Sequence, residues 1–197
     1  MATAVYMTDR WCSRGHFNTD QADKYEELCQ KVRPRYALET GFCTGRSAAC
    51  VLQYAEPWLR SMISVEESLD RKAGRGRAMA SRLEARFPVF RVIECPSKKV
   101  LTPEFFRSQF PEGIDFATVD GDHTFDGCMF DLTSIAPYLT KHGRIVVDDY
   151  RSAPPNGVRI PSVTECVDNF LSQNVGRFDG ECWHREGKGF CIIRRRE

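Results

Sequence analysis

The sequence predicts an α/β fold, with a mostly parallel sheet of seven strands and helices on both of its faces. Short apolar segments that can form strands alternate with segments of helical periodicity along most of the 197 residues, which is typical of a parallel sheet. Two of these segments, 114–120 and 144–149, run through apolar residues and then stop in carboxylates. Strands buried on both faces have this continuous apolar pattern. Two final strands lie close together in the chain and predict an antiparallel hairpin at the carboxyl end.

The first half of the chain contains three of the expected strands. Thr19 is placed to cap a first helix with apolar residues at helical spacing, and Pro34 ends that helix. Gly74 and Gly76 weaken the start of a long polar helix after the second strand. We expect strands at 36–39, 61–66 and 89–94, and helices at 19–32, 46–54 and 70–87.

The second half contains the other four strands. A short helical region is expected from Pro103, because proline is favoured in the first turn of a helix. Ser152–Pro161 is rich in proline, glycine and asparagine and is interpreted as a loop over the strand ends, where lids and acceptor-binding elements often occur. The final hairpin is expected to turn around Glu186–Lys188. We expect strands at 114–120, 144–148, 177–184 and 189–194, and helices at 126–139 and 162–173.

The composition indicates one globular domain, residues 1–197, with balanced charge. The chain has 28 basic and 27 acidic residues, a formal net charge of +1, and basic runs at 71–86 and 194–196 that contain no interleaved aromatic residues. Nucleic acid is therefore not expected as the main partner. No apolar stretch approaches the roughly 20 residues that span a bilayer, so no membrane partner is expected. An oligomer, or further domains in a longer protein, would be compatible with this sequence.

The nine cysteines favour a reducing, cytoplasmic location over a disulfide scaffold. Their number is odd, no signal peptide precedes them, and no pair has C-x-x-C spacing. A structural zinc site or a thioredoxin-like motif is therefore not expected. We expect Cys29, Cys50, Cys128 and Cys166 to act as small apolar residues of the core.

Acidic residues and one histidine follow the fourth and fifth expected strands. The carboxyl ends of parallel strands meet at one edge of a sheet, where open α/β sheets bind their ligands. We therefore expect one crevice to hold the side chains of Asp120, Asp122, His123, Asp148 and Asp149. Hard oxygen ligands suit Mg²⁺ or a similar divalent cation, and a histidine beside them could take a proton from a bound hydroxyl.

Structural roles compete for several of these residues. Aspartates at strand ends also act as helix caps and turn formers, and Asp122 could orient His123 or cap the next helix instead of meeting a cation. Asp126 is interpreted as a helix N-cap and is kept out of the site. His142 and His184 are expected to be structural or exposed.

A turn with two glycines follows the first strand, in Glu39-Thr-Gly-Phe-Cys-Thr-Gly-Arg-Ser47. Glycines let the backbone turn tightly and approach a ligand, and the helix that follows presents free N–H groups. Glu66 ends the second strand, where a carboxylate can accept both hydroxyls of a ribose. Together they indicate a cofactor that contains a nucleoside. Cys43 stands where G-x-G-x-x-G has its second glycine, which disfavours a pyrophosphate.

With these motifs the chain resembles class I S-adenosylmethionine-dependent methyltransferases. Within them it is similar to the small metal-dependent O-methyltransferases, which include catechol-type enzymes and the sugar-modifying enzymes of macrolide biosynthesis. The resemblance covers about residues 19–150 and implies a Rossmann-like fold, S-adenosylmethionine as methyl donor, S-adenosylhomocysteine as product, and O-methylation. The matching segments are the turn 39–47, the strand Ser64-Val-Glu66, Val119-Asp-Gly-Asp-His123 and 143–150.

The resemblance also implies a role for each matching residue. The methionine part of the donor would lie along the glycine turn, the ribose at the end of the second strand, and the adenine beside Ser97. A divalent cation such as Mg²⁺ would have Asp120, Asp148 and Asp149 as ligands, and His123 would act as general base with Asp120 beside it. The implied donor-binding residues are Glu39, Gly41, Gly45, Ser47, Glu66, Ser97 and Asp120.

His123 directs the expected acceptor toward a sugar, because catechol-type members usually have lysine at this position. We therefore expect methylation of a hydroxyl of a sugar or glycan, rhamnose-like in character. The alternative is a catechol or other small phenol, for which Trp11, Phe17 and Trp183 could build an aromatic slot. His16 could fold over the donor or the acceptor.

Two functions of other classes stay open. One is a nucleotide-cofactor oxidoreductase, which the missing second glycine and the carboxylate cluster both disfavour. The other is a non-catalytic binding module with a vestigial donor fold. That reading is disfavoured because every position implied for the donor and the cation holds a competent residue.

Overall fold

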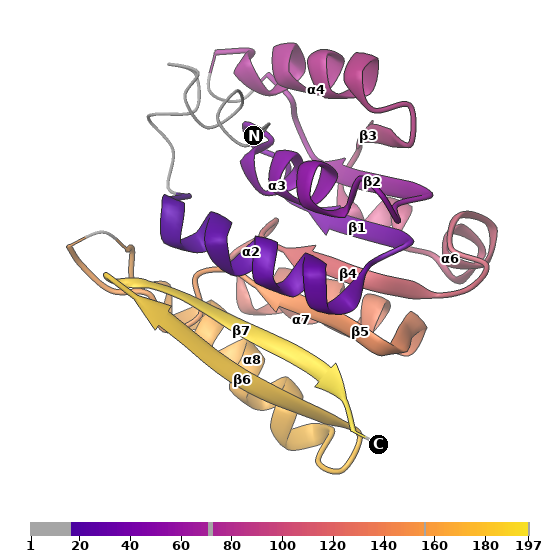
Figure 1. The fold of residues 1–197 in the computed structure, drawn as a ribbon. Helices are drawn as coiled ribbons and strands as arrows, with labels where there is room; N and C mark the ends of the chain where they lie inside the picture. Colours follow the sequence, from indigo (N-terminus) through magenta and orange to yellow (C-terminus); the bar gives the residue numbers. More distant parts are fainter. Residues whose placement is uncertain (1–16, 71–72, 156, 197) are drawn as a thin grey trace.

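A computed structural model describes residues 17–70, 73–155 and 157–196 of the chain. Its seven strands form one sheet in the order β3-β2-β1-β4-β5-β7-β6 (Figure 1). The first five pair in parallel, and β7 pairs antiparallel with both β5 and β6. The predicted fold is confirmed. The strands are β1 Tyr36–Thr40, β2 Ser61–Glu66, β3 Phe90–Glu94, β4 Ile114–Val119, β5 Leu139–Val147, β6 Phe178–Arg185 and β7 Lys188–Arg195.

Helices cover both faces of this sheet and divide the core into two layers (Figure 1). The residues of α2, α3 and α4 pack on one face around Tyr25 and Phe116, and those of α6, α7 and α8 pack on the other around Phe106 and Phe170. Buried strands between two helical layers need apolar side chains on both sides. The helices are α2 Thr19–Val32, α3 Arg46–Ala55, α4 Arg75–Arg86, α5 Ser97–Val100, α6 Pro103–Gln109, α7 Phe125–Ile135, the 3-10 turn η1 Ala136–Tyr138, and α8 Pro161–Gln173.

Two helix starts differ from prediction. Asn18, not Thr19, caps α2, because its side chain accepts a hydrogen bond from the backbone of Gln21 and the Gln21 side chain returns one to Asn18. This reciprocal pair is a capping box. The polar helix α4 begins at Arg75, because Gly74 takes the left-handed conformation, at φ 73°, directly before it.

Two boundaries in the second half also differ. The strand expected at 144–148 begins at Leu139, where it pairs with Ile114 before an irregularity in the register. The preceding helix accordingly ends at Ile135, and Thr124 caps it in place of Asp126 by accepting a hydrogen bond from Gly127.

The cysteines and the membrane prediction can be compared with the structure directly. Cys29, Cys50, Cys128 and Cys166 are all buried, as predicted, and none of the four is in a disulfide. Among the described residues, no helix is both long and apolar enough to cross a bilayer.

The capping box gives a first testable prediction. Asn18→Ala should lower the free energy of unfolding by about 1 kcal/mol, because it removes the hydrogen bond to the first turn. Thr19→Ala is the matched control, since Thr19 is exposed and lies one residue further along the same helix. Urea unfolding of both variants measures the difference, and an equal loss in the two would mean that Asn18 is not the cap.

Candidate active site

The candidate site lies at the carboxyl ends of β1, β4 and β5. β1 stands between β2 and β4, so the direction of strand order reverses there, and open α/β sheets bind ligands at such a point. Backbone hydrogen bonds continue past the strands: Asp120 donates to Thr40 at 2.9 Å, and Asp148 donates to Val119 at 3.0 Å. The loops after these strands are therefore held against one another.

The turn after β1 requires its two glycines. Gly41 has φ 87°, and a Cβ on it would overlap the backbone carbonyl of Asp120. Gly45 has φ 71°, and a Cβ there would overlap the ring of Phe42. Only glycine adopts these angles freely and leaves room for such close approach. The turn and the end of β4 are thus packed backbone against backbone.

Glu39 lies beneath this turn and is fully buried. One carboxylate oxygen accepts a hydrogen bond from the Ser47 hydroxyl, and the other accepts one from the Ser64 hydroxyl at 2.6 Å. Burial raises the pKa of Glu39 to about 7, and the two hydroxyl donors oppose that rise. Glu39 therefore fixes the turn from below, and both of its oxygens are already occupied by protein donors.

Glu66 joins the ends of two loops at the edge of the same turn. Its carboxylate accepts hydrogen bonds from the backbone N–H of Cys43 at 2.8 Å and of Ser68 at 3.1 Å. Ser97 is the first residue of the short helix α5 and is partly buried. The predicted donor-binding residues therefore lie along the ends of β1, β2 and β4 and at the start of α5. Their contacts with a donor stay predictions.

Three side chains converge beyond β4 and β5: Asp120, His123 and Asp149. The His123 Nε2 atom lies 3.0 Å from an oxygen of Asp120 and 3.8 Å from an oxygen of Asp149. One potential ligand atom from each residue lies within 4.8 Å of the other two. Asp149 reaches this position with φ 57°, a left-handed conformation that aspartate tolerates better than most residues. Two carboxylates and an imidazole in this arrangement could hold one divalent cation.

Asp148 was predicted as a cation ligand, but its side chain is turned toward α2. Its Oδ1 atom accepts hydrogen bonds from the Gln21 side chain at 3.3 Å and from the Asp149 backbone at 2.8 Å. Burial, together with the charges of Asp120 and Asp149, raises its pKa well above the usual range. The structure therefore brings His123 into the group where Asp148 was expected, and the role of Asp148 as a ligand stays a prediction.

His123 is held on both its side-chain and backbone sides. The hydrogen bond with Asp120 raises the pKa of the imidazole, and partial burial opposes that rise. The His123 carbonyl accepts a hydrogen bond from the Ser162 hydroxyl at 2.6 Å, near the start of α8. Asp122 accepts a hydrogen bond from the Thr124 backbone at 2.9 Å, so it serves the start of α7 and does not join the three converging side chains.

Three residues near the site were not predicted. Gln21 is fully buried and contacts Asp148 from α2, and Lys188 is buried at the start of β7. Asp131 on α7 is fully buried, and its pKa is raised by burial while the Ser97 and Thr40 hydroxyls oppose the rise. The capping-box spacing from Asn18 could have identified Gln21, but no local pattern indicates the other two.

A row of aromatic rings runs along the α2 side of the sheet. Phe17 packs edge-on against Tyr25, with centroids 5.2 Å apart, and Tyr25 packs against Phe190 at 5.6 Å. Trp183 then stacks on Phe190 at 4.9 Å. Phe17 and Trp183 are only partly buried. Trp11 and His16, two further residues predicted near the acceptor, lie outside the described residues.

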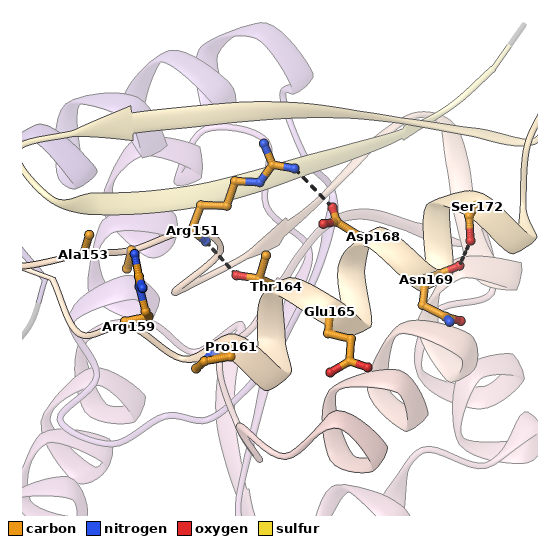
Figure 2. Close-up of a pocket in the computed structure, with 10 residues that line it drawn as sticks. Arg151, Ala153, Arg159, Pro161, Thr164, Glu165, Asp168, Asn169 and Ser172 are labelled. Carbon is orange, nitrogen blue, oxygen red and sulfur yellow. Dashed lines mark hydrogen bonds and ion pairs between the residues drawn. The ribbon is translucent and has the colours of Figure 1, made fainter.

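The loop over the strand ends forms one wall of a surface groove of about 770 Å³ against α8 (Figure 2). Arg151 crosses toward α8, where its guanidinium lies 3.5 Å from Asp168 and its backbone N–H donates to the Thr164 hydroxyl. None of the predicted site residues is among those that line this groove. Ser152, Ala153, Arg159 and Pro161 of this loop line the groove together with residues of α8. The predicted role of the loop at an acceptor stays untested.

Residues 38–150 match the family profile described as a methyltransferase domain. The fold is similar to that of an O-methyltransferase from Bacillus cereus in complex with S-adenosylhomocysteine, at 14% identity and a TM-score of 0.69 over 91% of this chain and 82% of that one. It is also similar to TomG of Streptomyces achromogenes, an O-methyltransferase of tomaymycin synthesis in complex with S-adenosylmethionine, at 18% identity and 0.70 over 91% and 81%.

A third similar structure is a Staphylococcus aureus protein provisionally assigned as a caffeoyl-CoA O-methyltransferase, at 14% identity and a TM-score of 0.65 over 90% of this chain and 84% of that one. No curated protein sequence matches this chain significantly. The predicted resemblance to class I O-methyltransferases is confirmed at the level of family and fold. Of these three structures, only the Staphylococcus aureus protein is named with an acceptor, a caffeoyl-CoA.

The close approach at Gly41 can be tested by comparison with Gly74, a glycine that also has a left-handed backbone conformation. Gly41→Ala should lower the free energy of unfolding by about 3 kcal/mol or more, because a left-handed residue and a backbone overlap are combined. Gly74→Ala is the matched control: it has φ 73° with open space around its Cβ, so only about 1–2 kcal/mol should be lost. Urea unfolding compares the two, and equal losses would contradict the packing of the turn against β4.

Proposed function

The chain belongs to the methyltransferase-domain family, and on that basis we propose that it transfers the methyl group of S-adenosylmethionine to a hydroxyl oxygen with the help of a divalent cation. The observation that carries this proposal is the convergence of Asp120, His123 and Asp149 directly beside the glycine turn. Gly41 contacts the end of β4, so a donor on the turn and a cation at the carboxylates would lie next to each other.

The donor would bind across the ends of β1 and β2. Gly41 and Gly45 leave the space for its methionine part, and Ser47 lies at the start of α3 above the buried Glu39. Glu66 would hold the ribose hydroxyls. Its carboxylate already accepts two backbone donors, which fixes its orientation but leaves lone pairs for a ligand. Ser97 would lie beside the adenine, and Asp120 would face the donor from β4.

The carboxylates fit a divalent cation by chemistry and spacing. Asp120 and Asp149 supply hard oxygen ligands, and Asp148 directly precedes Asp149 in the chain. Both Mg²⁺ and Mn²⁺ suit such oxygen ligands. When bound, the cation would lower the pKa of an acceptor hydroxyl and orient it toward the methyl group. The protein itself supplies the fixed ligand positions and the neighbouring base.

His123 is proposed as that base. Its side chain is 43% exposed, so it can meet an acceptor that enters from solvent. Asp120 holds one ring nitrogen through the 3.0 Å contact, which sets the direction of the ring. A neutral imidazole could accept the hydroxyl proton as the oxygen attacks the methyl group, and the methyl leaves sulfur as the new C–O bond forms.

A planar phenol or catechol is the acceptor that we propose first. The partly exposed rings of Phe17 and Trp183 stand at the two ends of the aromatic row on the α2 side, toward which Asp148 also turns. A phenolic hydroxyl also ionises more readily than an aliphatic one, with a pKa of about 10. A sugar hydroxyl is the second candidate, favoured by the histidine at position 123 where catechol-type enzymes usually have lysine.

The reaction can be tested with a labelled methyl group. We expect transfer from S-adenosylmethionine to a catechol or other phenol in the presence of Mg²⁺ or Mn²⁺, and its loss under excess chelator. Labelled rhamnosides without labelled phenols would establish the sugar acceptor instead. Transfer that ignores the chelator would contradict the metal-assisted mechanism. Calorimetry should show binding of S-adenosylhomocysteine and none of NAD, and the opposite result would favour an oxidoreductase.

The role of His123 is tested by a variant and a matched control. His123→Ala should reduce turnover by roughly 100-fold, as the loss of a general base does, with the affinity for S-adenosylhomocysteine unchanged. His142→Ala is the control, because His142 is exposed on β5 away from the carboxylates. If His123→Ala instead abolishes cation binding in calorimetry, the imidazole is a ligand. Unchanged turnover would remove it from the mechanism.

A further inference from the structure

Two cysteines stand directly opposite each other in the C-terminal hairpin. The antiparallel register pairs Cys182 of β6 with Cys191 of β7, and residues at opposite positions send their side chains to the same face of a sheet. Phe178 lies four residues before Cys182 and shares its face. It packs against Phe170 of α8 with ring centroids 5.6 Å apart, and Cys191 belongs to the same buried cluster. Both thiols therefore lie on the α8 face of the hairpin.

The backbone pattern brings the two cysteines close together. Gly189 donates its N–H to the Ser152 hydroxyl, away from β6, so it forms no backbone hydrogen bond with the residue opposite it. The turn at 186–187, where both residues have positive φ, predicts the same, because the residues that flank a two-residue turn bond to each other. Bonded and non-bonded pairs alternate, so Cys191, two residues after Gly189, also faces Cys182 in a non-bonded pair. The Cα atoms of such a pair are about 4.5 Å apart, within the roughly 4.4–6.8 Å that a disulfide spans.

The sulfur of Cys191 already leans toward β6. A Cβ on Gly180 would lie 3.0 Å from this sulfur, so the missing side chain of Gly180 leaves room for it. Gly180 precedes Cys182 by two residues and shares its face. The remaining movement is a rotation of the two cysteine side chains about their Cα–Cβ bonds.

The two thiols differ in access and in reactivity. Cys182 is exposed, whereas only 1% of Cys191 is exposed. Burial raises the pKa of the Cys191 thiol to about 12, and the neighbouring Cys182 adds to that rise. Because the thiolate is the nucleophile in disulfide exchange, Cys191 is a poor first attacker. Cys128 and Cys166 also contact each other, between α7 and α8, but both are buried. Only the hairpin pair therefore combines contact with access for a reagent.

We propose that Cys182 and Cys191 are a thiol modification site, which closes to a cross-strand disulfide by exchange with a small-molecule disulfide such as oxidised glutathione. The Cys182 thiolate attacks one sulfur of the reagent, whose S–S bond breaks and releases one thiol. The Cys191 sulfur then attacks the Cys182 sulfur and releases the second thiol. The protein loses two electrons and two protons, and the reagent takes up both as it becomes two thiols. Excess reducing thiol reverses the exchange. The inference does not depend on the proposed methyl transfer.

The test uses peptide mapping of the folded protein. Trypsin separates the two cysteines, because Arg185 and Lys188 lie between them. The protein is incubated with oxidised glutathione at pH 8, its remaining thiols are alkylated, and the tryptic peptides 178–185 and 189–194 are followed by mass spectrometry. We expect loss of both single peptides and the appearance of one linked pair, which dithiothreitol separates again. Cys95→Ser is the matched control, because Cys95 is a partly exposed cysteine outside the hairpin, and this variant should form the same link.

Variants of the pair test the order of the two steps. Cys182→Ser should form no link. Cys191→Ala should stop at the mixed disulfide, with glutathione retained on Cys182, and Cys191→Ser gives the same test if alanine disturbs the core. Glutathione that stays on Cys182 of the wild type without a link, or unchanged peptides, would overturn the inference. A link of Cys191 to another cysteine in place of Cys182 would overturn it as well. None of these results bears on the proposed methyl transfer, since none of them measures it.

Discussion

The whole site depends on the contact between the backbone of Gly41 and the backbone of Asp120. These residues directly follow two neighbouring parallel strands, and the absence of a side chain at Gly41 lets the glycine turn and the loop that carries Asp120 meet. Asp120 then donates its N–H to Thr40, and Asp148 donates its own to Val119, so the β5 loop is placed by the β4 loop. A larger residue at position 41 would push the glycine turn away from the loop after β4, because this one contact positions both of them.

Charge is distributed unevenly around that contact. Glu39 accepts hydrogen bonds from two hydroxyls beneath the turn and supports the turn from there. Asp120 and Asp149 are different, since they converge with His123 beyond the strand ends, and desolvation raises the pKa of Asp120. Carboxylates this close together in partly buried surroundings are costly unless positive charge compensates them. His123 approaches both carboxylates from the β4 loop, with its Nε2 atom 3.0 Å from Asp120 and 3.8 Å from Asp149.

The local sequence patterns were sufficient for the fold and for the strand ends, but not for contacts made between distant elements. β2 was predicted with its observed bounds because apolar residues fill it and a carboxylate ends it. The cap of α2 was misassigned because Asn18 and Thr19 are adjacent cap formers, and only the glutamine three residues after Asn18 decides between them. Lys188 lies in a hairpin whose sequence resembles an exposed turn. Its burial follows from packing against the β5 loop, where Gly189 donates to the Ser152 hydroxyl, and no local pattern contains that information.

The position of Asp148 separates two accounts of how the cation site is built. If Asp120, His123 and Asp149 are the ligands, then Asp148 stays with Gln21, and the imidazole is committed to the cation and unavailable as a base. If Asp148 turns from Gln21 to the cation, His123 is released and can accept a proton from the acceptor. The long 3.3 Å hydrogen bond between Gln21 and Asp148 is the weaker of the two that hold this carboxylate, since the other, from Asp149, is 2.8 Å. Both bonds are accepted by Oδ1, so a rotation of the Asp148 side chain toward the cation would disturb the Asp149 bond as well as the weaker Gln21 bond. A ligand bond would have to compensate for both, and the second account then gives His123 its proposed role.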